Sequence, residues 1–397
     1  MLKQLKNISY LTISQIVSSV SIFLLNLIWA RGYSVESYGT YKLLITTISI
    51  FSVFALSGLN NTLIISSGKK KGKNFFEIFK RKVSVGLAIS IILFIVIGQL
   101  TFFNDLSYFT IILISTLFPF YINNSNWRYY LQGNSNFKDF CLWVVLESLF
   151  VLTVVYICYD LKFDYNILIC LLIGSRVLIN NIFNFRVVKR TSNEEIDISL
   201  IKEGYKYTPG LIVGSLILFE NYIIQYNLSV VDVAKYSIML IFPLQIKTVF
   251  EISNKLLSKT IVSLNILKFW YWFKKFIPIL ILIYLVIGIL GYLSVEHVIN
   301  YFFGAKYSDI ASSSALIFLI YSMNFPIAYL NQSLILNGYT KYHFLFQTTT
   351  TLLKLMTLFI FTFLFGMKGV IYVFIITTIY NLSFVMISFR MKLKFIK

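Results

Sequence analysis

The feature that most constrains this chain is a series of apolar runs separated by short polar connections. Each run is about 20 residues long, and a helix of that length crosses the hydrocarbon core of a bilayer. Only 13% of the residues are charged, about half the share that soluble domains carry. These observations predict an all-α polytopic membrane protein.

Twelve of the apolar runs are long enough to span a membrane. They cover residues 10–30, 43–66, 83–101, 109–126, 141–159, 167–185, 208–228, 236–254, 276–295, 311–332, 344–365 and 370–389. The connections between them are short, which leaves no room for a catalytic domain outside the membrane.

A repeated motif suggests that half of the chain is duplicated. Residues 34–44 read SVESYGTYKLL, and residues 229–239, at an offset of 195, read SVVDVAKYSIM. A second pair has an offset of 205, with LQGNSNFK at residues 131–138 and LNGYTKYH at residues 336–343. Short echoes also arise by chance in so biased a composition. Their order and similar offsets favour an internal repeat.

Six spans precede the most polar connection and six follow it. We therefore predict a six-helix bundle at residues 1–190, a cytoplasmic linker at 191–207 and a second six-helix bundle at 208–397. An even number of spans in each half gives both halves the same orientation, as in transporters built from parallel repeats. A substrate path would then run between the halves.

The basic residues predict the orientation of the chain. One set of connections, together with both ends, holds 26 lysines and arginines, whereas the opposite set holds six. Because lysine and arginine collect on the cytoplasmic side of membranes, both termini are expected to be cytoplasmic. Topology thus accounts for most of the formal charge of +19, and we expect no nucleic acid partner.

Six charged residues remain inside the predicted spans. Each costs about 2.5–3.5 kcal/mol at the bilayer centre on insertion scales, so each should face a bundle interior or a wet cavity. Such a set is hard to explain in a passive scaffold and indicates a path for substrate or ions. The bases are Arg176, Lys247 and Lys354, and the acids are Glu147, Glu220 and Glu251.

Arg176 and the pair formed by Lys247 and Glu251 each allow alternative interpretations. Arg176 shares a helix face with Asn180 and Asn184, and such a polar stripe favours a cavity lining over packing alone. Lys247 and Glu251 are four residues apart on one helix, so they could simply pair with each other.

Glu220 also has two possible roles. It could be the acid of a proton-coupled switch, or it could form an ion pair with Arg176 or Lys354. Glu147 and Lys354 occupy nearly equivalent places in the two halves. We therefore expect that an acid–base bridge between Glu147 and Lys354 crosses the cleft and breaks during transport.

The sequence gives little support for a metal site or for enzymatic chemistry. The three cysteines lie inside apolar runs without CxxC spacing, which is typical of small core residues. His297 and His343 stand apart in different connections, so we expect neither a metal nor another cofactor. No nucleotide-binding loop is present, and hydrolysis of ATP by this chain is not expected.

Three motifs resemble those of the polysaccharide flippases, the Wzx-type exporters of O-antigen, capsule and exopolysaccharide in the MATE-like MOP superfamily. LIWARGYSVESYGTY, residues 27–41, looks like the turn between their first two spans. FGAKY at residues 303–307 and GMKG at residues 366–369 are similar to their motifs before the tenth and the last span. Together the motifs cover the chain from end to end.

The resemblance implies two bundles in a V, and a transporter that works by alternating access without ATP. The substrate would be an oligosaccharide linked to undecaprenyl diphosphate, flipped outward across the bacterial cytoplasmic (inner) membrane. Membrane lipids and a glycan polymerase would be its other partners. The positions at the substrate would be Arg176, Lys247, Lys354, Arg31 and Asn180, and those in ion coupling would be Glu220, Glu147 and Glu251.

Two other functions are compatible with parts of the sequence. A multidrug or cation antiporter of the same superfamily would share the fold, but three intramembrane bases favour an anionic substrate. An integral membrane transferase that modifies glycans would need a catalytic residue at one surface, for which His297 beside Glu296 is the one candidate. We therefore expect a transporter and not an enzyme.

Overall fold

The computed structural model describes residues 2–263, 266–326, 328–330 and 340–396, and every regular element in these ranges is helical. As predicted, the chain is an all-α polytopic membrane protein. Its contacts divide it into two compact units, which we call unit 1 (Met1–Leu218) and unit 2 (Phe219–Lys397).

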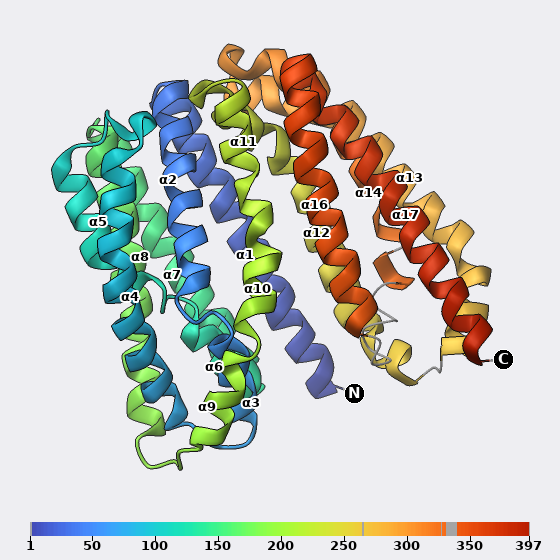
Figure 1. Ribbon diagram of the computed structural model, residues 1–397, viewed down its shortest axis with the longest axis horizontal. Helices are drawn as coiled ribbons and strands as arrows, with labels where there is room; N and C mark the ends of the chain where they lie inside the picture. The colour runs from blue at the N-terminus through green and yellow to red at the C-terminus, as the bar shows by residue number, and fades with distance from the viewer. Residues whose placement is uncertain (1, 264–265, 327, 331–339, 397) are drawn as a thin grey trace. The chain divides into compact units, whose positions relative to one another are not determined.

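The helices of unit 1 are labelled in Figure 1. Polar side chains fix where several of them begin, since Ser107, Asn136 and Asp164 each accept a backbone N–H at the start of α5, α7 and α8. The helices are α1 (Leu2–Gly32), α2 (Val35–Phe54), α3 (Leu59–Gly68), α4 (Asn74–Gln99), α5 (Tyr108–Tyr121), α6 (Asn126–Gly133), α7 (Phe137–Asp160), α8 (Tyr165–Thr191), α9 (Ile198–Tyr205) and α10 (Thr208–Ser215).

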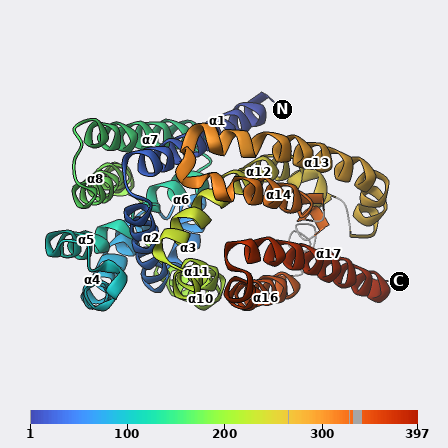
Figure 2. The same cartoon turned by 90° about the horizontal axis from the view of Figure 1, so that it is seen from above.

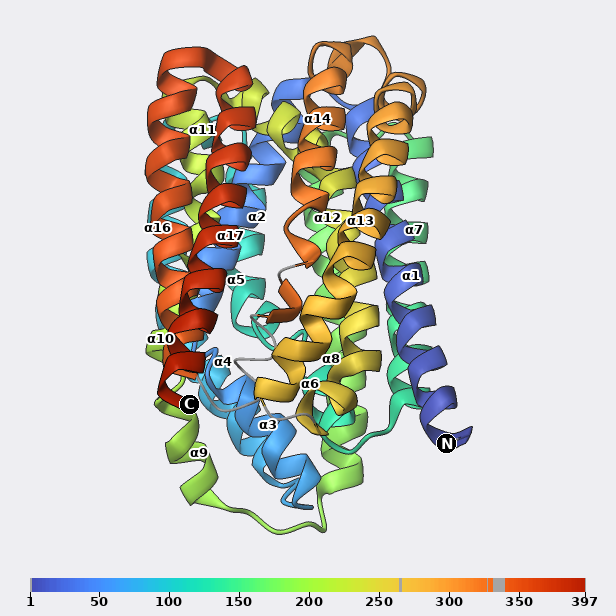
Figure 3. The same ribbon diagram turned by 90° about the vertical axis from the view of Figure 1, so that its right-hand side faces the viewer.

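Unit 2 begins at the last residue of the short 3-10 helix η2 (Leu216–Phe219). Within it, α16 lies beside both α11 and α17 (Figure 3). Its described helices are α11 (Glu220–Asn227), α12 (Val230–Ser263), α13 (Ile266–Phe303), α14 (Ala311–Ser322), α16 (Thr340–Phe365) and α17 (Gly369–Ile396).

Over the residues that the structure describes, each of the twelve predicted spans falls on a helix or on a broken helix. The second span consists of α2 and α3, which are bent by 62° at the break between them. The seventh consists of α10, η2 and α11. Within the described residues, seven helices qualify as spans by length and hydropathy, or eight with the bent pair. α5 and α14, at 14 and 12 residues, are too short to qualify alone.

The division between the units lies further along the chain than the predicted linker at 191–207. Residues 191–218 belong to unit 1, because α9 packs on α3 and polar contacts hold the preceding loop. The side chain of Asn74 exchanges two hydrogen bonds with the backbone of Asp197, at 3.0 and 2.7 Å. Arg81 also donates to the hydroxyl of Tyr205 at 2.9 Å.

The first repeated motif forms the same local structure in both copies. Ser34 caps α2 by accepting the N–H of Ser37 at 3.0 Å, and Ser229 accepts the N–H of Asp232 at 3.2 Å at the start of α12. Tyr41 and its counterpart Tyr236 are both buried. For the second motif, residues 336–339 and the side chains of 340–343 lie outside the described part of the chain.

The helix packing repeats as well. In unit 1, α1 packs against α2 and α7, α4 against α5, and α8 against both α5 and α7. The counterparts in unit 2 make the same contacts, with α11 against α12 and α16, α13 against α14, and α17 against both α14 and α16. Figure 2 shows each set from above. The six-helix repeat is thus present in the packing of each unit.

We expect Gly133→Ala to destabilise unit 1 by about 2–3 kcal/mol, because overpacking at a site bounded by backbone cannot be relieved cheaply. A Cβ atom on Gly133 would lie 2.2 Å from the carbonyl oxygen of Ile64. Gly174→Ala in α8 is the matched control, since nothing lies within 4 Å of its added Cβ. Thermal unfolding in detergent should show a lower melting temperature for Gly133→Ala only, and equal melting temperatures would contradict the packing described here.

Candidate functional site

Unit 1 contains a polar pocket of about 400 Å³, which we call the inner pocket. The pocket is lined by residues from α2, α3 and the turn before it, α4, the end of α5 with the turn after it, α8 and η2. Among its described lining residues two are basic and none is acidic. Besides Lys82 and Arg176, the polar groups come from Ser49, Ser52, Ser57, Asn60, Tyr121, Asn124 and Ser125.

Lys82 is the more deeply buried of the two bases, with 1% of its surface exposed. Its ammonium group donates hydrogen bonds to Asn60 Oδ1 at 3.1 Å, to Asn126 Oδ1 at 2.9 Å and to the carbonyl of Ile122 at 2.8 Å. These contacts use all three donors of an ammonium group. Every acceptor is neutral, so the contacts solvate the charge without balancing it.

The position of Lys82 follows from the buried face of α4. Phe75, Ile78, Lys82 and Gly86 are spaced three or four residues apart, so they share one side of the helix. A Cβ atom on Gly86 would lie 2.9 Å from Pro119 Cα. A glycine at this place lets α5 approach α4 closely, which brings the turn after α5 within reach of the ammonium group.

Arg176 supplies the second positive charge of the inner pocket, from α8. It is half-buried and is hydrogen-bonded with the hydroxyl of Tyr121. Lys42, which donates to Asn26 Oδ1 at 2.8 Å, lies near enough to repel it, and Glu147 near enough to attract it. Glu147 has another basic partner, so the interior of unit 1 carries an excess of positive charge, which favours an anionic ligand.

That other partner of Glu147 is Arg128, with which it forms a salt bridge. The second carboxylate oxygen of Glu147 accepts a hydrogen bond from Asn180 Nδ2 at 3.0 Å. Glu147 is therefore engaged inside unit 1 by one charged and one neutral donor. Glu147, the acid of the fifth span, therefore connects α7 to α6 and to α8.

Of the predicted polar stripe on α8, only Arg176 lines the inner pocket. Asn180 and Asn184 are each 1% exposed. Their side-chain oxygens accept hydrogen bonds from Trp127, one from the indole N–H at 2.6 Å and one from the backbone N–H at 3.2 Å. These two asparagines hold α6 against α8, and neither lines the inner pocket.

Two buried polar atoms of the inner pocket have no hydrogen-bond partner among the described residues. They are Ser57 Oγ and Asn124 Oδ1. Leaving a buried polar atom unsatisfied costs about 1–3 kcal/mol, so a ligand or water that supplied partners here would be stabilised. Together with the two bases, these atoms make the inner pocket suited to a ligand that is both anionic and hydroxylated.

Unit 2 contains a compensated pair of charges. Glu220, the first residue of α11, is buried, and its Oε1 lies 2.6 Å from Lys354 Nζ of α16. The other carboxylate oxygen accepts a hydrogen bond from the hydroxyl of Tyr236 on α12. The ammonium group also lies 5.1 Å from the centre of the Phe374 ring. The ion pair and its two aromatic neighbours thus connect α11, α12, α16 and α17 of one unit.

The structure separates the predicted site residues into different places. Of the two proposed roles of Glu220, the ion pair with Lys354 is the one present in the structure. Glu147 and Lys354 each form an ion pair within their own unit, with Arg128 and with Glu220. Arg31 lines another pocket of unit 1, at the end of α1. α12 includes positions 247 and 251, but the side chains of Lys247 and Glu251 lie outside the described part of the chain.

The sequence interpretation missed Lys82, which we counted with the basic connection before the third span. α4 begins at Asn74, eight residues before that lysine. The helical spacing of Phe75, Ile78 and Gly86 places Lys82 on an apolar face, and this pattern could have identified it as buried. Without that pattern, a lysine near the end of a span is readily assigned to a basic cytoplasmic connection.

Comparisons with known proteins agree with this architecture. A family described as "Polysaccharide biosynthesis protein" matches the chain over residues 4–240, which is more than half of its length. No curated protein sequence matches the chain.

Several solved structures share the fold at low sequence identity. An inward-facing multidrug resistance MATE family transporter of the MOP superfamily has a TM-score of 0.73 and 13% identity, covering 95% of this chain and 96% of that one. An outward-facing one has a TM-score of 0.69 and 15% identity, covering 98% and 96%. A MOP superfamily transporter from Pyrococcus furiosus, described as having a binding pocket of reverse polarity that suggests a different function, has a TM-score of 0.64 and 14% identity, covering 98% and 96%.

Proposed function

The chain belongs to the polysaccharide biosynthesis protein family, and from this premise we propose that it flips an oligosaccharide linked to undecaprenyl diphosphate across the membrane. Its fold is that of a membrane transporter. The diphosphate and the sugars would pass through the protein while the polyprenyl chain stays in lipid. The glycan delivered to the outer leaflet would serve the synthesis of O-antigen, capsule or exopolysaccharide.

The observation that carries this proposal is the inner pocket. Lys82 and Arg176 both line it, and none of its described lining residues is acidic. A diphosphate is a compact polyanion, and hydrogen bonds between charged partners are about twice as strong as neutral ones. An exporter of organic cations would face repulsion from the same two bases. The serine and asparagine groups of the pocket suit the hydroxyls of the first sugar.

The ion pair of unit 2 supports a role for Glu220 in coupling to protons. Protonation of this carboxylate would cancel its attraction for Lys354 and release α11 from α16. One proton that crosses a potential of 100 mV supplies about 2.3 kcal/mol, which biases a two-state equilibrium about fiftyfold. That bias is sufficient to drive alternating access in one direction.

The orientation that we propose follows from the basic residues. In unit 1 the N-terminus, the loop before α4 and the loop before α9 lie at the same end (Figure 1). These segments carry many of the lysines and arginines, so this end is assigned to the cytoplasm and the membrane to the bacterial cytoplasmic membrane. A glycan polymerase on the outer side would then receive the product.

Arg176→Ala tests the proposal in a strain that lacks its own polysaccharide flippase. Loss of one charge-assisted contact of about 1.5–3 kcal/mol predicts a reduction in surface glycan of about 10- to 150-fold relative to the unsubstituted protein. Arg186→Ala is the matched control, because Arg186 is exposed on the same helix. Equal membrane levels should be verified for each variant. Full activity of Arg176→Ala would remove the support that the inner pocket gives.

A further inference from the structure

A second pocket of unit 1, which we call the outer pocket, lies at the opposite end from the basic loops. α1 and α7 both end there, as Figures 1 and 3 show. Its volume is about 510 Å³, which is within the range of small-molecule sites. The lining residues are Arg31 and Gly32 at the end of α1, Tyr33 just after it, Tyr159 and Asp160 at the end of α7, and Lys162 and Phe163 in the turn that follows.

Close contacts hold the aromatic walls of the outer pocket in place. The hydroxyl of Tyr33 donates a hydrogen bond to the carbonyl of Phe163 at 3.1 Å, which links the end of α1 to the turn after α7. Burial raises the pKa of Tyr33 to about 12, so the hydroxyl remains a donor. A Cβ atom on Gly32 would lie 2.6 Å from the ring of Tyr159, so glycine leaves room for that ring. The pocket is therefore formed before any ligand arrives.

The turn that supplies Lys162 has a costly backbone conformation. Lys162 has a φ of 54°, in the left-handed region that favours glycine. It closes α7 with two hydrogen bonds, from its own N–H to the carbonyl of Tyr159 at 3.1 Å and from the N–H of Phe163 to that of Cys158 at 3.0 Å. Helices that end in this way usually carry glycine at this position. A lysine here brings an ammonium group to the rim of the pocket at the expense of backbone energy.

The groups that line the outer pocket match the chemistry of a sugar. The rings of Tyr159 and Phe163 are 38% and 37% exposed, and their electron-rich faces attract the C–H groups on the flat side of a pyranose. Arg31 and Lys162 donate hydrogen bonds, while Asp160 accepts them, as sugar hydroxyls require.

We propose that the outer pocket binds one sugar unit of an oligosaccharide on the outer face. The source of that oligosaccharide rests on the proposed function, since the exported glycan emerges on this side. Occupation of the pocket would hold the glycan after its diphosphate has left the inner pocket. This would make return of the product slower than its release to the next enzyme.

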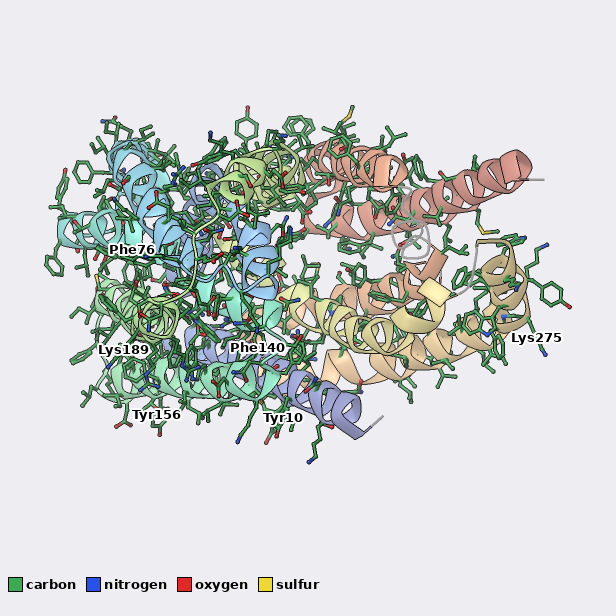
Figure 4. All side chains as sticks on the ribbon, turned by 90° about the horizontal axis from the view of Figure 1, so that it is seen from below. Tyr10, Phe76, Phe140, Tyr156, Lys189 and Lys275 are labelled. Carbon is green, nitrogen blue, oxygen red and sulfur yellow. The ribbon has the colours of Figure 1, made fainter. Side chains whose placement is uncertain are left out.

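The test measures binding of a free oligosaccharide to the full-length protein in lipid nanodiscs. The probe is the oligosaccharide that mild acid releases from the cells' own lipid-linked pool, without carrier or diphosphate, observed by saturation-transfer NMR. Tyr159→Ala and Asp160→Asn are each expected to weaken binding at least tenfold. Tyr156→Ala is the matched control, because Tyr156 is a tyrosine of the same helix that points away from the bundle (Figure 4). It should bind like the unsubstituted protein.

Three results would overturn the proposal. One is the absence of sugar binding, and another is an equal loss in Tyr156→Ala, which would indicate a general aromatic anchor at the membrane surface. The third is a native mass spectrum in which the unsubstituted protein carries phosphatidylethanolamine and no sugar, and Tyr159→Ala has lost that lipid. Arg176→Ala separates this inference from the proposed function, since it should reduce flipping by about 10- to 150-fold and retain sugar binding. If the unsubstituted protein binds sugar but transports no glycan, the proposed function fails and this inference stands.

Discussion

Lys82→Met is expected to reduce transport by about 10- to 100-fold and to lower the melting temperature of the protein. Three polar acceptors, on Asn60, Asn126 and Ile122, would lose their donor in a buried site. Each unsatisfied group costs about 1–3 kcal/mol, partly offset because a buried and unbalanced charge has gone. The inner pocket would also lose one of its two positive charges, which reduces its attraction for a diphosphate.

Lys80→Met is the matched control for this substitution. Lys80 lies two residues earlier on α4 and is exposed, so its replacement should change neither transport nor stability. Lys82→Gln adds a second comparison, because an amide can donate to two of the three acceptors without a charge. It should recover stability but not transport. If Lys82→Met transports normally, the inner pocket does not hold the anionic part of the substrate.

Glu220→Gln is expected to lower the melting temperature strongly and to abolish the dependence of transport on a proton gradient. Lys354 would keep a charge that is only 18% exposed and would lose its partner. Removing one member of a buried ion pair costs about 3–5 kcal/mol. The amide cannot gain or lose a proton in the working range, so transport could no longer respond to the gradient.

The double variant Glu220→Gln/Lys354→Met separates stability from coupling. It removes the unpaired charge, so it should regain most of the lost melting temperature while transport remains independent of the proton gradient. Glu296→Gln is the control, because Glu296 is exposed on α13 of the same unit. Proteoliposomes with an imposed pH gradient provide the measurement. A normal proton response in the double variant would show that another group carries the coupling.

The number and positions of the spans could be predicted because hydrophobicity repeats along the chain and needs no tertiary information. The repeat was visible for a similar reason. Ser34 and Ser229 each cap a helix by accepting the N–H of the residue three positions later, so the motif depends on local sequence only. The roles of buried polar residues could not be predicted in this way. Asn180 was expected at a cavity and in fact contacts Trp127, because its partner comes from a helix 53 residues away in sequence.

The charged residues show the same limit. A span assigned from hydropathy starts where the charges end, so Lys82 was read as part of a loop although α4 begins at Asn74. The acid Glu147 was expected to pair across the halves, yet Arg128 lies in the neighbouring helix and is nearer in sequence. In both cases the sequence shows that a charge is costly to bury, but it does not show which group offsets that cost.

The break in the seventh span has a consequence for how this chain accumulates mutations. α10 packs on α2 and belongs to unit 1, whereas α11, a few residues later, belongs to unit 2. In a chain derived from duplication, a natural joint between the ancestral copies would be the polar stretch after α8. In this chain that stretch and α10, the first part of the seventh span, pack within unit 1. Substitutions in α10 are therefore constrained by the helices of unit 1, although its place in the repeat is that of the first helix of the second half.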